Sequence, residues 1–329
     1  MKLIKRVKGL KGFYLHRGQE VRIYKDKICV GDNELKAEPD DDFFEENGNL
    51  TKHKLGKSGT RMLYNNGVFE EEKLRYSIAI YFAPDVYYSK MEEGNVFKYS
   101  FMENGTEYLF EIESEKSLSR IEYNPGNSVL MIPTSGDRQL LFYTKTGERL
   151  WVYDEEDVVK GTELKIVRFP SVVDDVVVII SRIITERIYK AQGFKIRTGE
   201  KLWELRDDDC PDYLFEGDDK MLYGCLSIYD ELVLCRLDPF TGKFDKLAVK
   251  RDEGISVCPW NVTMHNNRLY YGSNRPGCEF GIIDCGKKEL VESVALGLKS
   301  GYQIGAPKIS DGKAYVFSRF AGELRVYEL

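Results

Sequence analysis

One short unit occurs twice in this chain and limits the folds that the chain can adopt. Residues 140–153 read LLFYTKTGERLWVY and residues 193–205 read GFKIRTGEKLWEL. In each copy an alternating stretch leads into Thr-Gly-Glu and continues as Leu-Trp. Alternation with a period of two indicates a β-strand, and the glycines at 147 and 199 supply the positive φ that a tight turn requires. Both units are therefore predicted to be β-hairpins.

Turn glycines mark the same unit along most of the chain. With Gly147 and Gly199 as the reference, further turns fall at Gly67, Gly105, Gly242 and Gly286, mostly about 40–45 residues apart. Each interval holds four short alternating runs and almost no helix-forming sequence. A repeat of this length with four strands is typical of β-propeller blades. We therefore predict an all-β chain, folded as one β-propeller domain over residues 1–329.

The two ends of the chain suggest how the ring closes. The segment after residue 306 has room for only three strands, which would leave an unpaired edge. A strand from the N-terminal run, within residues 3–16, can fill the fourth place. This gives about seven four-stranded blades. Residues 33–60 are polar and rich in turns, so we interpret them as a loop excursion of the first blade.

The six residues Thr146–Trp151 and their second copy, Thr198–Trp203, resemble the Thr-Gly-x-x-Leu-Trp motif of quinoprotein (PQQ-like) propeller repeats. In that family the tryptophan docks between neighbouring blades. The resemblance therefore implies structural roles for Trp151 and Trp203 and for the turn glycines Gly147, Gly199 and Gly242, although Thr241-Gly242 is followed by no tryptophan. Quinoprotein dehydrogenases also hold a quinone and Ca²⁺ near a vicinal disulfide. This sequence has no Cys-Cys pair, so we expect neither cofactor nor metal.

Composition excludes several classes of function. The net charge is -6 and the pI is about 5.4, which argues against a nucleic-acid binder. No segment approaches the ~20 apolar residues of a membrane span, and no secretion signal is visible, so we expect a cytoplasmic protein. Three dispersed histidines do not form a local zinc motif. The chain also lacks the short motifs of common hydrolases and nucleotide-binding enzymes.

One catalytic alternative remains open. Propeller glycosidases collect their two carboxylates from the inner strands of different blades. The acids near the expected inner strands here are Asp85, Glu122, Glu163 and Asp212. A carbohydrate-active enzyme is thus one alternative, and a structural interaction scaffold is another.

Acidic residues recur in the connections that should emerge on one face of the ring. They lie in the links between blades and in the turns between second and third strands, and those considered for partner binding are Glu92, Glu93, Asp154, Glu155, Glu156, Asp157, Asp207, Asp208, Asp209, Asp230, Glu231, Asp252 and Glu253. The turns expected on the other face carry basic residues, namely Lys145, Arg149, Lys201, Lys243, Lys287 and Lys288. The acidic face would then be a docking face for a basic protein surface, whose approach the field would speed and select.

These features together predict a non-catalytic, protein-binding propeller. The partner should have a basic surface that meets the acidic face, as an inhibitor or immunity-type protein would cover a basic toxin or nuclease domain. We expect no nucleic-acid or membrane partner, and a monomer when the protein is free.

Overall fold

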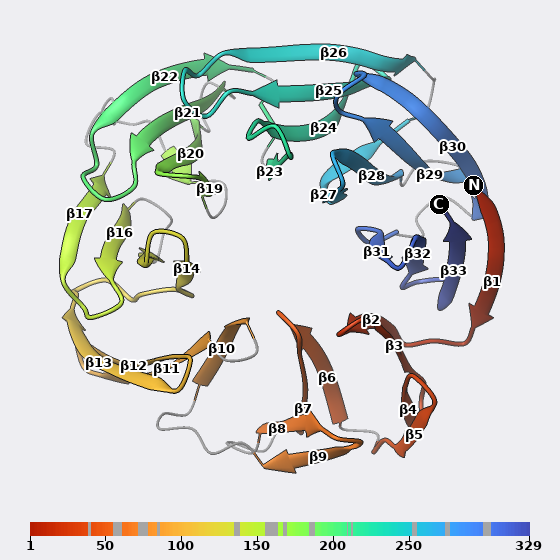
Figure 1. Ribbon diagram of the computed structural model, residues 1–329, viewed down its shortest axis with the longest axis horizontal. Coiled ribbons are helices and arrows are strands. Elements are labelled where there is room, and N and C mark those ends of the chain that lie inside the picture. The colour runs from red at the N-terminus through yellow and green to blue at the C-terminus, as the bar shows by residue number, and fades with distance from the viewer. Residues whose placement is uncertain are drawn as a thin grey trace.

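Eight antiparallel sheets surround a central axis in the computed structural model (Figure 1). The structure describes residues 1–38, 41–54, 61–71, 78–83, 86–134, 139–154, 164–166, 170–183, 188–208, 210–211, 213–251, 255–273, 277–298 and 304–329. Over these residues all regular structure is β-strand. The prediction of an all-β propeller is confirmed, and we call each sheet a blade.

The blades follow one another along the chain, and each is built from the axis outward. Blades 1 to 3 consist of β2 (Gly12–His16), β3 (Gln19–Ile23), β4 (Lys27–Val30) and β5 (Asn33–Lys36); β6 (Asp41–Glu46), β7 (Asn49–Lys54), β8 (Arg61–Asn65) and β9 (Val68–Glu71); and β10 (Ile78–Ala83), β11 (Val86–Glu93), β12 (Val96–Glu103) and β13 (Thr106–Glu113). Blades 4 and 5 consist of β14 (Glu122–Asn124), β15 (Val129–Pro133), β16 (Gln139–Thr144) and β17 (Arg149–Asp154); and β18 (Leu164–Ile166), β19 (Ser171–Val173), β20 (Val176–Ile183), β21 (Ile188–Lys195) and β22 (Lys201–Asp207). Blades 6 to 8 consist of β23 (Phe215–Glu216), β24 (Leu222–Ile228), β25 (Glu231–Leu237) and β26 (Phe244–Arg251); β27 (Val257–His265), β28 (Arg268–Ser273), β29 (Gly277–Asp284) and β30 (Glu289–Leu298); and β31 (Lys308–Ser310), β32 (Lys313–Ser318), β33 (Glu323–Glu328) and β1 (Lys2–Lys8).

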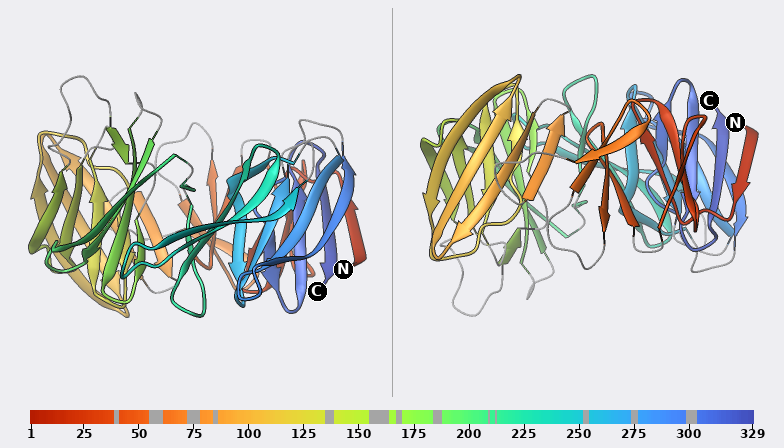
Figure 2. Two further views of the ribbon diagram at one scale, coloured as in Figure 1. Left: turned by 90° about the horizontal axis from the view of Figure 1, so that it is seen from above. Right: turned by 90° about the horizontal axis from the view of Figure 1, so that it is seen from below.

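The strands run between the two flat faces of the ring (Figure 2). Because successive strands in a blade are antiparallel, their connections alternate between the faces. The turn face carries the turns from first to second strand and from third to fourth strand. The loop face carries the turns from second to third strand and the links between blades. These two names are kept below.

The N-terminal strand closes the ring. β1 pairs with β33 from Lys2 opposite Glu328 to Lys8 opposite Glu323, and Arg6 Nε donates to Glu323 Oε1 at 2.8 Å. The termini meet at the outer edge of blade 8 (Figure 1). The predicted closure is confirmed. The N-terminal run is however divided, because residues 12–16 form β2, the innermost strand of blade 1.

The predicted blade count is wrong, since there are eight blades where about seven were expected. The error lies in residues 33–60, which were interpreted as an excursion. Their described part contains β5, the outer strand of blade 1, and the hairpin of β6 and β7 that starts blade 2. Only Phe43 and Leu50 are buried hydrophobic residues in that hairpin. The apolar alternation is therefore short, and flanking charges conceal it.

The core of the ring lies between the blades. The middle strands are nearly continuous apolar runs, as in β15 (VLMIP), because both faces of each middle strand pack against neighbouring sheets. The outer strands alternate exposed and buried residues, as β13 does, because one face meets solvent. A cluster that includes Tyr99, Phe101 and Phe110 of blade 3 and Tyr123 of blade 4 shows how one apolar layer joins two sheets.

Trp151 and Trp203 lie at two such boundaries. Trp151 Nε1 donates to the carbonyl oxygen of Ile196 in blade 5 at 2.8 Å, and its ring covers Gly199. Trp203 Nε1 donates to the carbonyl oxygen of Pro239 in blade 6 at 2.7 Å. Both side chains are half-buried at these boundaries.

Each tryptophan ring packs against a turn glycine of the next blade. A Cβ at Gly199 would lie 2.6 Å from Cδ2 of Trp151, and a Cβ at Gly242 would lie 2.6 Å from Cδ2 of Trp203. At Gly147 the neighbour is Cβ of Phe110, at 2.3 Å. All three glycines have positive φ, so both the backbone and the contact require glycine.

Candidate functional site

The loop face brings together the predicted acidic residues that the structure describes. Glu92 and Glu93 are exposed at the turn between β11 and β12 in blade 3, and Asp154 is exposed at the end of β17 in blade 4. Asp207 ends β22 in blade 5, and Asp208 follows it. These acids therefore follow one rim over three blades.

Blade 6 adds two more acids to this rim. Asp230 and Glu231 lie at the turn between β24 and β25, where both are half-buried. The remaining predicted acids lie outside the described residues, namely Glu155, Glu156, Asp157, Asp209, Asp252 and Glu253.

Basic neighbours offset part of the charge of the rim. Glu93 is 2.7 Å from Lys98 Nζ within its own hairpin, and Asp207 is 2.7 Å from Lys246 Nζ of the next blade. An ion pair between exposed groups contributes little stability, but it lowers the field that a partner would meet. The rim thus has a weaker field than the number of acids implies.

The turn face is not uniformly basic. Among the predicted basic residues, Lys145 pairs with Glu103, and Lys201 is 3.3 Å from Glu204. Acids also lie in the turns of this face, since Asp174 and Asp175 form ion pairs with Lys220 and Lys195. Arg149, Lys243, Lys287 and Lys288 lie in or beside the turns between third and fourth strands, as their sequence positions indicated.

Exposed aromatic side chains are the feature of the loop face that the sequence analysis missed. Tyr229 at the turn between β24 and β25 is 97% exposed, and Phe320 at the turn between β32 and β33 is 64% exposed. Trp260 in β27 is 53% exposed. We call these three residues the loop-face aromatics. Large exposed aromatic residues are enriched at protein interfaces.

Two of the loop-face aromatics, Tyr229 and Trp260, lie in adjacent blades that are hydrogen-bonded to each other. Ser227 Oγ, close to Tyr229, accepts a 2.9 Å hydrogen bond from the backbone of Val257, at the start of the strand that carries Trp260. A register irregularity between Val257 and Val262 interrupts the pairing of β27 with β28 around Trp260. The Trp260 ring also lies 6.2 Å from that of Tyr213, centre to centre. Tyr213, Tyr229 and Trp260 thus lie at the junction of blades 6 and 7.

A signal for Trp260 was present in the sequence. The chain has three tryptophans, and two of them occupy the repeated Leu-Trp position after a turn glycine. Trp260 follows Cys-Pro and lies outside that pattern, so the role that the repeated motif implies for the other two tryptophans does not extend to it.

Inner strands of the ring line a cavity of about 440 Å³. Glu122, Ser171, Glu216 and Met264 line it from four consecutive blades. Arg120 Nε is 3.7 Å from Glu122, and Lys220 Nζ is 2.8 Å from Glu216. Both carboxylates of this cavity thus lie beside a basic side chain.

The carbohydrate-active alternative depended on four acids. Only Glu122 lies in the described part of the chain, while Asp85, Glu163 and Asp212 lie outside it. The described residues also contain no group of three or more His, Cys, Asp or Glu side chains placed to hold a metal ion.

Comparison with known proteins identifies the architecture alone. No protein-family profile matches the sequence, and no curated protein matches it. A computationally designed protein, Ika8, is similar over 100% of this chain and 98% of its own, with TM-score 0.59 and 13% identity. Sqt1 of Saccharomyces cerevisiae is similar over 100% of this chain and 100% of its own, with TM-score 0.57 and 12% identity.

An enzyme is also among the similar structures. Dihydro-heme d1 dehydrogenase NirN, solved in complex with DHE, matches 88% of this chain and 67% of its own, with TM-score 0.57 and 11% identity. At these identities the likeness concerns the fold. In the described part of the chain, no helix is long and apolar enough to span a membrane.

Proposed function

We propose that this chain is a non-catalytic β-propeller that binds a protein partner through its loop face, and that it acts in the cytoplasm. The observation that carries the proposal is the set of loop-face aromatics. Burying an aromatic side chain removes about 150–250 Å² from water. A soluble protein that leaves Tyr229, Trp260 and Phe320 exposed over three consecutive blades has anchors for a partner surface.

The acids of the same face favour a partner with a basic surface. Asp230 and Glu231 adjoin Tyr229, and the rim continues through Asp208 and Asp154. Complementary charge at the edge of an interface speeds encounter and selects among partners. An inhibitor or immunity-type protein that covers a basic toxin or nuclease domain is the narrow form of this proposal, and a general interaction scaffold is the broad form.

The first experiment locates the interface. A photo-crosslinking amino acid is placed at position 229, with a matched copy at Leu109, which is exposed on the outer strand β13. The proposal expects a discrete crosslinked protein from position 229 and none of the same mass from position 109. Equal crosslinking at both positions would contradict it.

The second experiment uses the purified partner. Trp260→Ala should weaken binding at least tenfold, the effect expected of a central aromatic anchor. Leu109→Ala is the control and should leave binding unchanged. An unchanged affinity for the Trp260→Ala variant would move the interface elsewhere.

Charge reversal separates the narrow form from the broad one. Replacing Asp154, Asp208 and Asp230 with Lys should slow association with a basic partner and reduce its dependence on salt. Reversal of Lys243 and Lys288 on the turn face should have little effect. If both sets change the association rate equally, the partner is not selected by the acidic rim.

A further inference from the structure

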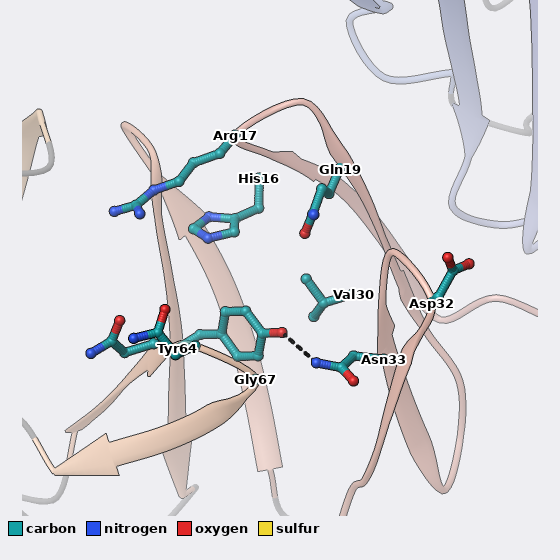
Figure 3. A pocket seen from close by; sticks show the side chains of 10 residues that line it. His16, Arg17, Gln19, Val30, Asp32, Asn33, Tyr64 and Gly67 are labelled. Atoms are coloured by element: carbon teal, nitrogen blue, oxygen red, sulfur yellow. Dashed lines mark hydrogen bonds between the residues drawn. The ribbon is translucent and has the colours of Figure 1, made fainter.

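A polar cavity of about 500 Å³ lies between blades 1 and 2 on the turn face (Figure 3). Blade 1 contributes His16, Gln19 and Asn33, and blade 2 contributes Tyr64 and Asn66. The volume falls within the range of small-molecule sites, about 300–1,000 Å³. The cavity is remote from the loop face, on the opposite side of the ring.

This boundary differs from those that tryptophan closes. Trp151 and Trp203 stand four residues after Gly147 and Gly199, whereas the fourth residue after Gly31 is Leu35. At Gly67, the turn glycine of blade 2, the contact comes from an amide, since a Cβ there would lie 2.9 Å from Asn33 Nδ2. Polar side chains therefore line the space at a boundary that has no indole.

Two hydrogen bonds connect the walls of the cavity. Asn33 Nδ2 donates to the Tyr64 hydroxyl at 3.4 Å, which Figure 3 shows as a dashed line. Arg17 Nε donates to the carbonyl oxygen of Gly48 at 3.2 Å. Both bonds cross from blade 1 to blade 2, so they fix the position of one wall of the cavity relative to the other.

His16 is a buried polar group that this packing leaves unsatisfied. The residue is 5% exposed, and its ring meets the edge of Tyr64 at 5.8 Å between centres. Its Nδ1 is buried without a hydrogen-bond partner among the described residues. A buried polar group without a partner is costly, which makes it a candidate for ligand recognition.

The chemistry of His16 follows from its environment. Burial, with a smaller contribution from the Arg17 charge, lowers the pKa of His16. The imidazole is therefore neutral at pH 7. A neutral imidazole carries its proton on either Nδ1 or Nε2. The tautomer with an unprotonated Nδ1 is favoured here, because it avoids a buried N–H group without an acceptor. The proton then resides on Nε2, which can donate.

We propose that this cavity binds a neutral sugar, recognised through one pyranose ring. Primary amides both donate and accept hydrogen bonds, as sugar hydroxyls do, and the lining includes Gln19, Asn33, Asn65 and Asn66. The Tyr64 ring provides an apolar surface for the C–H groups of a pyranose. Asp32 and Arg17 bring opposite charges, so the lining does not select an anion such as phosphate.

The test uses histidine NMR of the full-length protein. The chain contains only His16, His53 and His265, so labelling the imidazole Cε1 atom alone gives three signals. His16→Gln assigns the His16 signal. The probes are the methyl glycosides of glucose, galactose and mannose, added separately at millimolar concentrations, with inorganic phosphate as a fourth probe.

At least one glycoside should shift the His16 signal saturably and leave that of His265, in blade 7, unchanged. If no glycoside shifts His16, or if only phosphate does, the proposal is overturned.

A matched pair of variants locates the binding. Asn66-Gly67 and Asn104-Gly105 are equivalent turns in blades 2 and 3, and Asn66 and Asn104 both have positive φ. Glycine tolerates that conformation, so Asn66→Gly removes an amide of the cavity without backbone strain, and Asn104→Gly makes the same change outside it. Asn66→Gly should weaken binding of the effective glycoside about tenfold, the effect of one lost hydrogen-bonded amide. Asn104→Gly should have no effect. Equal affinities for the two variants would overturn the proposal.

Discussion

The Trp151 indole joins blade 4 to blade 5, because its Nε1 donates a 2.8 Å hydrogen bond to the carbonyl oxygen of Ile196 while its ring covers Gly199. The same ring stacks on Phe142 of its own blade at 3.9 Å between centres. One side chain thus makes two contacts with the neighbouring sheet and one with its own. Stability of the ring should depend on such boundary residues more than on residues within one sheet.

We expect Trp151→Ala to lower the free energy of unfolding by about 3 kcal/mol, below the upper range for tryptophan because the side chain is half-buried. Trp151→Phe keeps much of the ring but removes the Nε1 donor, and it should cost about 1 kcal/mol. Urea denaturation measures both values. Loss of less than about 0.5 kcal/mol in the alanine variant would show that the indole does not hold the boundary.

Gly199→Ala should destabilise the protein more than Gly105→Ala. Both glycines have positive φ, so each alanine strains the backbone by about 1 kcal/mol. At Gly105 the new Cβ meets nothing within 4 Å, whereas at Gly199 it would lie 2.6 Å from the Trp151 ring. We expect about 2–4 kcal/mol at Gly199, including displacement of the indole. Equal destabilisation by the two variants in thermal unfolding would mean that the Trp151 ring moves aside without a loss of stability.

Removal of residues 1–8 should destabilise the whole ring. The deletion exposes the edge of β33 and breaks the pairing that closes the ring. We expect a large fall in melting temperature together with an increased radius of gyration in solution scattering.

Arg6→Ala is the control for this deletion. It removes only the half-exposed partner of Glu323 and should have a small effect. If the truncated protein melted with the full-length protein, ring closure would not depend on β1.

The Glu103 ion pair should make stability depend on pH. Lys145 Nζ and the Tyr123 hydroxyl, both of blade 4, donate to Glu103 of blade 3. The hydrogen bond from Lys145 is the main cause that lowers the pKa of Glu103, followed by the one from Tyr123. A lowered pKa means that this stabilisation is present above the unfolded value of about 4.3 and is lost as the pH falls through the folded value.

Glu103→Gln should therefore cost about 1–2 kcal/mol near pH 7 and less near pH 3, because pH 3 lies below the unfolded pKa and the stabilisation by the charged carboxylate declines there. The control is Glu148→Gln. Glu148 is exposed in the turn between β16 and β17, and its replacement should show no such difference between the two pH values. Chemical denaturation of the three proteins at both pH values tests this. A cost for Glu103→Gln that stayed constant with pH would exclude the ion pair as its origin.

The eighth blade shows where reading the sequence lost information. Gly31 stands 36 residues before Gly67, close to the repeat length, and Asn47-Gly48 is a hairpin turn with both residues at positive φ. The turn signals of blades 1 and 2 were therefore present. The strands between them have few apolar residues, and charged side chains hid the alternation that identifies the other blades.

The candidate site was predictable in part. The strand order places the connections on alternating faces, so the acids that the structure describes were assigned to one rim from the sequence. Their ion pairs were not, because Asp207 meets Lys246 of another blade, and such a contact depends on how two sheets lie side by side. The exposure of Tyr229 and Trp260 likewise depends on which neighbours cover a residue, and local sequence does not encode this.

By itself, the sequence determined the local structure of this protein. Alternating hydrophobicity and turn glycines specify strands and hairpins, and their repetition leads to a ring of blades. Tertiary structure alone decided that eight blades close the ring, that Trp151 and Trp203 are half-buried, and that a polar cavity remains between blades 1 and 2. The reason is physical: strand and turn signals act within a few residues, whereas closure, burial and cavities arise from contacts between sheets that are distant along the chain.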